Sequence, residues 1–104
     1  MAKEFTFRKA NSGNLMKINL QLPKVAKQYG SSHPDILEVQ KVFEVMKKKT
    51  MAAMIGRKGN PELSEEFDRL REITNNYTVP EGVNENFVAV YRAFEEIDKV
   101  YQTL

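Results

Sequence analysis

The residues best suited to chemistry in this sequence are basic, and they are densest between Lys41 and Lys58. Lysine and arginine neutralise phosphates, so such a cluster is typical of a nucleic-acid-binding surface. On a helix, however, three consecutive lysines point in three directions around the axis, and only some of them can face one ligand. We therefore keep nucleic-acid binding as the alternative hypothesis. Its candidate residues are Lys41, Lys47, Lys48, Lys49, Arg57 and Lys58.

Two glycines flank the last two of these residues in the segment IGRKG, Ile55 to Gly59. The spacing resembles the GxxG loop of KH domains, which grips a nucleic-acid backbone. A KH loop joins two short helices beside a small sheet, whereas here a helix of about twenty residues precedes the loop. The glutamates that follow suit the helix dipole and would repel a phosphate at that position. We favour a corner between two helices, with Gly56 ending the first and Asn60 capping the second.

Catalytic and metal-binding motifs are not recognisable in this chain. His33 is the only histidine, and there is no cysteine, so disulfides, thiolate zinc sites and cysteine nucleophiles are excluded. A lone histidine forms neither a nucleophile–base pair nor a metal-ligand set by itself. We expect a protein that is not an enzyme and that uses no cofactor.

Length and composition indicate one globular domain spanning residues 1–104, with 41% hydrophobic and 29% charged residues. The lack of cysteine fits a reducing compartment, and the first thirty residues hold no continuous apolar stretch. No run approaches the roughly 18 apolar residues of a membrane span. We expect a cytoplasmic protein without a membrane partner.

The small net charge of +2 hides a strong division along the chain. Residues 1–60 carry a net charge of +8, whereas residues 61–104 carry −6. Such asymmetry is a known indication of nucleic-acid or membrane contact. We favour the simpler interpretation that a basic face of the first half packs beside an acidic face of the second.

The first thirty residues allow two interpretations. EFTFR and KINLQL alternate apolar and polar residues around the turn-forming NSGN, which predicts a β-hairpin. Alternatively, Leu15, Ile18, Leu22, Val25 and Tyr29 are spaced by three and four, as in a helix. Pro23 lies inside that helix and would interrupt it. We favour a hairpin or extended arm over residues 1–30.

The remainder of the chain predicts three helices, over residues 34–55, 61–76 and 84–103. Asn60 and Pro61 suit the start of the second helix. The third helix has the most regular apolar stripe and begins near Asn84. The predicted fold is therefore mainly α: a small three-helix bundle with an N-terminal β-hairpin or extended arm.

The helix at 34–55 has an apolar arc wider than a small bundle normally covers. An exposed apolar patch on such a helix usually marks an interaction site, and methionines make it adaptable. The competing explanation is that Phe5 and Phe7 of the N-terminal hairpin cover this side. The candidate partner-binding residues are Leu37, Val45, Met46, Lys48 and Met51.

Two segments, GSSHPDILEV at 30–39 and LREITNNYTVPEGVNENFVAVYRAFEEID at 70–98, carry a family resemblance. They resemble parts of the hemerythrin-like domain of the di-iron proteins that repair iron–sulfur clusters. That family binds iron through histidines and glutamates on four helices, and neither segment holds a ligand motif. His33 lies where the family has no ligand. The resemblance therefore implies a relative unable to hold two irons, and no function is carried over from it.

These observations together favour a non-catalytic helical module that binds a protein or regulates one, with self-association as one form of that binding. Its partner is another protein or a second copy of the chain.

Overall fold

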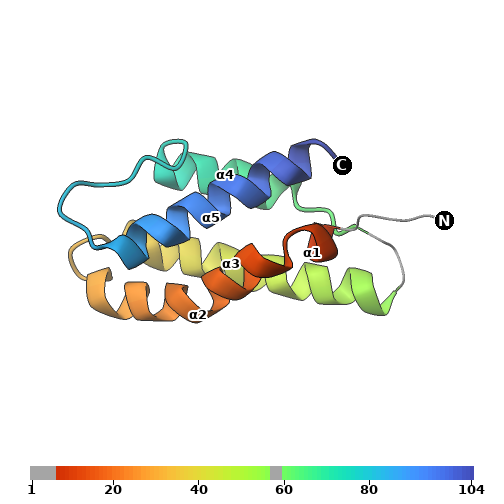
Figure 1. Ribbon diagram of the computed structural model, residues 1–104, viewed down its shortest axis with the longest axis horizontal. Helices are drawn as coiled ribbons and strands as arrows, with labels where there is room; N and C mark the ends of the chain where they lie inside the picture. Colours follow the sequence, from red (N-terminus) through yellow and green to blue (C-terminus); the bar gives the residue numbers. More distant parts are fainter. Residues whose placement is uncertain (1–6, 57–59) are drawn as a thin grey trace.

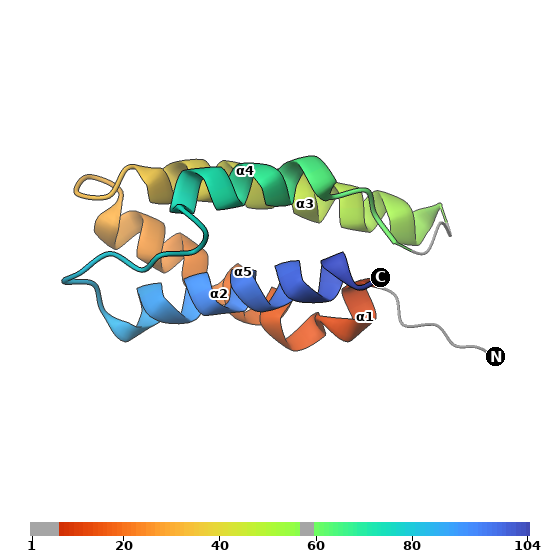
Figure 2. The same ribbon diagram turned by 90° about the horizontal axis from the view of Figure 1, so that it is seen from above.

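The computed structural model describes residues 7–56 and 60–104, which form five α-helices and no strand. They are α1 (Phe7–Ala10), α2 (Ser12–Tyr29), α3 (Asp35–Ile55), α4 (Ser64–Thr74) and α5 (Glu85–Gln102). The four long helices run alternately in opposite directions along an elongated bundle of 47 × 23 × 19 Å (Figure 1). Seen from above, α2 and α5 form one layer, and α3 and α4 form the other (Figure 2).

The core lies between these two layers and is rich in phenylalanine. Phe43 of α3 meets Phe94 of α5 edge to face, with ring centroids 5.6 Å apart. Phe7 of α1 meets Phe67 of α4 in the same way at 6.1 Å. Because each pair joins helices from opposite layers, the aromatic contacts hold the layers together. The largest fully buried side chains are Phe7, Phe43, Phe67, Phe87, Phe94, Ile18, Leu22, Ile36, Met46, Leu63, Leu70 and Ile97.

The predicted hairpin or arm over residues 1–30 is wrong for the residues described, because 7–29 are helical. The alternation that suggested a strand misled because Leu20 is exposed while Ile18 and Leu22 are buried. The spacing by three and four determines the structure, and α2 continues through Pro23. A proline inside a helix costs about 3 kcal/mol, which the burial of several apolar side chains offsets. Phe5 lies outside the described residues.

The helix count of three is also too low, since two of the five helices lie in the segment assigned to the hairpin. The helices predicted at 34–55 and 84–103 are found at Asp35–Ile55 and Glu85–Gln102. Asn84 caps α5 by accepting a hydrogen bond from the Phe87 N–H at 3.1 Å. As expected for a corner between two helices, α3 ends at Gly56, whose N–H donates a hydrogen bond to the Ala52 carbonyl.

The helix predicted over 61–76 is shorter and begins at Ser64, not at Pro61. Asn60 is not its N-cap, because its Oδ1 accepts a hydrogen bond from the Phe7 N–H at 2.6 Å. The Leu63 N–H donates to the Tyr101 hydroxyl at 2.9 Å. The turn before α4 is therefore fastened to α1 and α5 by long-range contacts that local sequence does not reveal.

A buried carboxylate fastens α4 to α5. Asp98 is only 5% exposed and accepts hydrogen bonds from Arg71 Nε at 2.8 Å and from the Tyr77 hydroxyl at 2.7 Å. Gln102 Nε2 donates a further bond at 3.0 Å. Burial alone would raise the pKa of Asp98, but the bonds from these three side chains outweigh it and lower the pKa. The charged carboxylate is thus the form that the fold stabilises.

The connection after α4 uses an unusual backbone conformation. Asn75, Asn76 and Tyr77 all have positive φ angles, between 52° and 63°. Asparagine tolerates this region, but for tyrosine it is strained. The Thr74 hydroxyl accepts a bond from the Tyr77 N–H at 2.8 Å, and the Tyr77 ring is buried. These contacts hold Tyr77 in place so that its hydroxyl reaches Asp98.

We expect Asp98→Asn to destabilise the protein at pH 7 by about 1–3 kcal/mol, because Arg71 loses its buried partner. A lowered folded-state pKa gives stability that is complete above the unfolded value of about 3.9 and is lost as pH falls through the folded value. The variant should therefore lose less stability than the wild type between pH 5 and acidic values, measured by denaturant unfolding at each pH. The control is Asp68→Asn, which removes an exposed partner of the same arginine. Equal acid dependence in the wild type and Asp98→Asn would contradict the assignment.

We expect Pro23→Ala to raise the free energy of unfolding by about 1–3 kcal/mol, because an exposed helix interior regains a backbone hydrogen bond to Asn19. Lys24→Ala, at the neighbouring exposed position, should change it by less than about 0.5 kcal/mol. Thermal unfolding of both variants checks this. A destabilised Pro23→Ala protein would mean that the bundle requires the distortion that proline imposes on α2.

Candidate functional site

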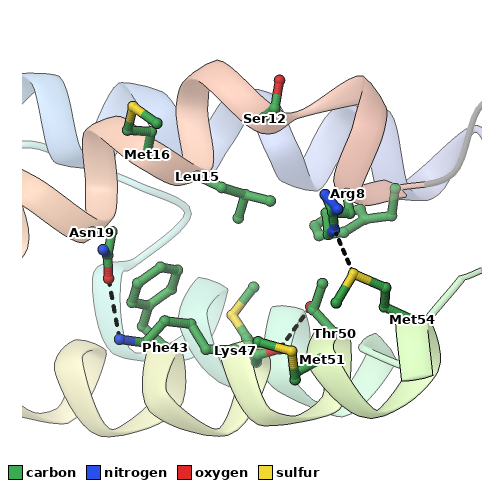
Figure 3. A pocket seen from close by; sticks show the side chains of 12 residues that line it. Arg8, Ser12, Leu15, Met16, Asn19, Phe43, Lys47, Thr50, Met51 and Met54 are labelled. Carbon is green, nitrogen blue, oxygen red and sulfur yellow. Dashed lines mark hydrogen bonds between the residues drawn. The ribbon is translucent and has the colours of Figure 1, made fainter. Parts of the chain in front are cut away.

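A groove of about 610 Å³ lies between α1 and α2 on one side and α3 on the other. Figure 3 shows its side chains converging from both walls. We call it the α2–α3 groove. It is lined by Phe7, Arg8, Ser12, Leu15, Met16, Asn19, Phe43, Met46, Lys47, Thr50, Met51 and Met54.

The floor and the rim of the groove differ in character. Phe7, Phe43 and Met46 are buried and form a rigid apolar floor that is part of the core. Met16, which is 65% exposed, and Met51, which is 53% exposed, stand on opposite rims. Methionine is unbranched and polarisable, so rims of this kind adapt to the shape of a ligand. The arrangement suits an apolar ligand of variable shape better than a small polar substrate.

Two exposed contacts span the groove, one toward each end (Figure 3). Lys47 Nζ donates to Asn19 Oδ1 at 3.1 Å, and Arg8 Nε contacts Met54 Sδ at 3.3 Å. Lys47 also pairs with Glu44 at 3.1 Å and lies over the Phe43 ring. Exposed contacts of this kind contribute little to stability. The groove can therefore exchange both contacts for those of a ligand at low cost.

The groove is long enough for a helix. Arg8 and Asn19 are eleven positions apart on one wall, and Phe43 and Met54 are eleven positions apart on the other. At 1.5 Å per residue, the α3 wall is about 16 Å long, or three helical turns. A helix of that length presents apolar anchors at three or four successive turns.

A second, shallower hollow of about 400 Å³ lies on the outer side of α3 and shares Lys47 and Met51 with the groove. Lys48 lines it, together with Ile55, which is 73% exposed. The apolar surface therefore continues from the groove across α3, with lysines beside it.

The structure brings some of the predicted partner-binding residues together and leaves others apart. Met46 and Met51 line the groove, and Lys48 lines the adjoining hollow. Leu37 and Val45 are exposed but line neither.

Sequence reasoning missed the other wall, formed by Arg8, Leu15 and Met16, because that segment was assigned to a hairpin. The signal was present: Met16 falls outside the stripe of Leu15, Ile18 and Leu22, which identifies an exposed apolar residue on a helix.

Among the described basic residues of the nucleic-acid hypothesis, Lys41, Lys47 and Lys49 pair with glutamates of the same chain, and Lys48 is exposed. Lys41 pairs with Glu38 at 3.8 Å, and Lys49 forms hydrogen bonds with both carboxylate oxygens of Glu66 at 3.0 and 2.9 Å. The hydrogen bonds from Lys49 to Glu66 raise the pKa of that lysine. Arg57 and Lys58 lie outside the described residues.

Within residues 7–56 and 60–104, no group of three His, Cys, Asp or Glu side chains is placed to hold a metal ion. His33 is half-buried, and its ring lies 5.8 Å from that of Tyr29 and 5.7 Å from that of Phe87. It therefore belongs to the packing at the α2–α3 loop.

None of the helices within the described segments is both long and apolar enough to span a bilayer.

No family model matches this chain, and no characterised protein or solved structure shows significant similarity to it. The resemblance to hemerythrin-like domains stays a prediction.

We expect Lys49→Met to destabilise the protein by about 1–2 kcal/mol, because it leaves Glu66, whose side chain is only 11% exposed, without its partner. Lys48→Met, one position away and exposed, should change the free energy of unfolding by less than about 0.5 kcal/mol. Denaturant unfolding of both variants checks this. Equal effects would show that Lys49 is as available to a ligand as Lys48.

Proposed function

We propose that this protein is a non-catalytic module that binds an α-helix of a partner protein in the α2–α3 groove. The observation that carries the proposal is the groove itself, about three helical turns long, with a buried apolar floor and exposed methionine rims. Helix-in-groove recognition uses this combination of an apolar trough and adaptable rims.

The fold leaves apolar surface around the groove exposed to water. Met16, Met51 and Met54 are each more than two-fifths exposed around one hollow, and Leu15 is half-buried beneath them. A partner helix would remove these side chains from water, and each apolar Å² buried contributes about 25 cal/mol. Because the floor is already packed in the core, binding would order only the rims, which limits its entropic cost.

Nucleic-acid binding is supported less well by the same surface. The exposed large apolar side chains among the described residues are all aliphatic, with no exposed phenylalanine or tyrosine. Single strands are bound mainly by stacking on aromatic rings, in addition to basic residues. Several of the candidate lysines are also paired with glutamates of the same chain.

We expect helical peptides selected from a displayed library to bind the wild-type protein and to lose at least tenfold in affinity for Met51→Glu. A carboxylate at that rim would be desolvated by an apolar partner, which is unfavourable. The matched control is Val45→Glu, an exposed apolar position of the same helix outside the groove, which should bind normally. Isothermal titration calorimetry measures the affinities.

The site of binding is checked by amide chemical shifts. The selected peptide should perturb the amides of Leu15, Met16, Thr50 and Met51 more than those of α4 and α5. No enrichment of helical peptides on the wild type over Met51→Glu, or perturbations confined to other helices, would overturn the proposal.

A further inference from the structure

The two charged side chains that line the α2–α3 groove, Arg8 and Lys47, are both basic. Residues 7–29, which form α1 and α2, hold five basic residues and no acidic one. Residues 45–55 of α3 hold three lysines and no acidic residue. Of these lysines, Lys47 lines the groove and pairs with Glu44, whereas Lys49 pairs with Glu66 of α4. The acidic residues of the chain are instead concentrated after residue 60, in and around α4 and α5. The apolar trough is therefore bordered by two electropositive helix segments.

We propose that the partner of this groove is an acidic amphipathic helix, with carboxylates beside the apolar strip that enters the trough. This inference rests on the proposed function and specifies its ligand. The methionine rims require only an apolar strip on the partner helix. The basic side chains of the groove favour acidic residues beside that strip and disfavour basic residues there.

The positions of the cations indicate where the carboxylates should lie. Arg8 lines one end of the groove, where its Nε contacts the Met54 thioether sulfur at 3.3 Å. A carboxylate is a much stronger acceptor for a guanidinium and would replace that contact. Lys47 lines the other end, where its contacts to Asn19 and Glu44 are exposed. Lys47 is seven positions from Met54, the residue that Arg8 contacts on α3, so two acidic groups about 10 Å apart, or two helical turns, would meet both cations.

A second copy of this chain fits the groove poorly. Two grooves placed face to face would bring like charges together, which is unfavourable. The acidic helices α4 and α5 of another copy offer no apolar strip, since the exposed large apolar residues among those described lie on α2, on α3 and at Leu104. The acidic amphipathic helix must therefore come from a different protein.

The test uses peptides selected from a displayed helical library on the wild-type protein, without bias in their charge. We expect the selected peptides to be rich in Asp and Glu beside their apolar positions. Replacing those residues with Asn and Gln should weaken binding at least tenfold at 50 mM salt. Raising the salt concentration to 300 mM should weaken the acidic peptide and leave the neutral one nearly unchanged.

Protein variants test the same inference from the other side. Arg8→Gln combined with Lys47→Gln should weaken the acidic peptide at least tenfold and leave the neutral peptide unaffected. The control is Lys24→Gln combined with Lys27→Gln, which removes the same charge from α2 beyond the groove and should retain most of the affinity. Circular dichroism establishes that both double variants remain folded.

The outcomes separate the two proposals. Equal binding of acidic and neutral peptides would overturn the charge inference while leaving helix binding intact. Failure of every selected peptide to distinguish the wild type from Met51→Glu would overturn the proposed function itself. A dimer of the wild-type chain that Met51→Glu dissociates, or an oligonucleotide that displaces the acidic peptide from the groove, would also overturn the inference, because the groove would then have another occupant.

Discussion

The packing of α2 against α5 is the constraint on which the rest of the structure depends. These two helices share the most extensive interhelical contact in the bundle. Ile18, Leu22 and Val25 of α2 are buried in the same core as the stripe of α5. A helix has one broad apolar face, and α2 uses most of it on α5. Only the edge of that face remains to contact α3. A groove therefore lies between α2 and α3, whereas a continuous core lies between α2 and α5. The candidate binding site is thus a consequence of how α2 divides its surface.

Polar contacts then fix the ends of the bundle. Asp98 is buried with its negative charge intact because Arg71, Tyr77 and Gln102 donate to it. Removing any one donor would leave part of a buried charge unsatisfied, which is costly. Tyr77 has a left-handed backbone conformation, and the bond from its hydroxyl to the carboxylate helps to hold it there. This network lies where α4 contacts α5, and none of its residues lines the α2–α3 groove.

The groove combines two properties that sequence reasoning treated separately. The wide apolar arc of residues 34–55 indicated a binding surface, and Met46 and Met51 do line the groove. The basic residues suggested nucleic acid, but they border an aliphatic trough without exposed aromatic rings among the described residues. Leu37 and Val45 belong to the same wide apolar arc, but neither is spaced by three or four from a groove residue, and both lie outside the groove. Periodicity places a residue on a face of a helix, but only the neighbouring helix determines which part of that face becomes a groove.

The sequence by itself determined the helical class, the helices that became α3 and α5, the start of α5 near Asn84 and the division of charge, because these depend on local spacing and composition. It did not determine the secondary structure of residues 7–29, because the spacing of Ile18 and Leu22 fits both a strand and a helix. Only the tertiary structure decided this: burial of the helical stripe against α5 outweighs the roughly 3 kcal/mol that Pro23 costs. The same decision placed Arg8 and Met16 opposite Met51 and Met54. Residues so distant in the chain share one groove only because non-local packing brings their helices together.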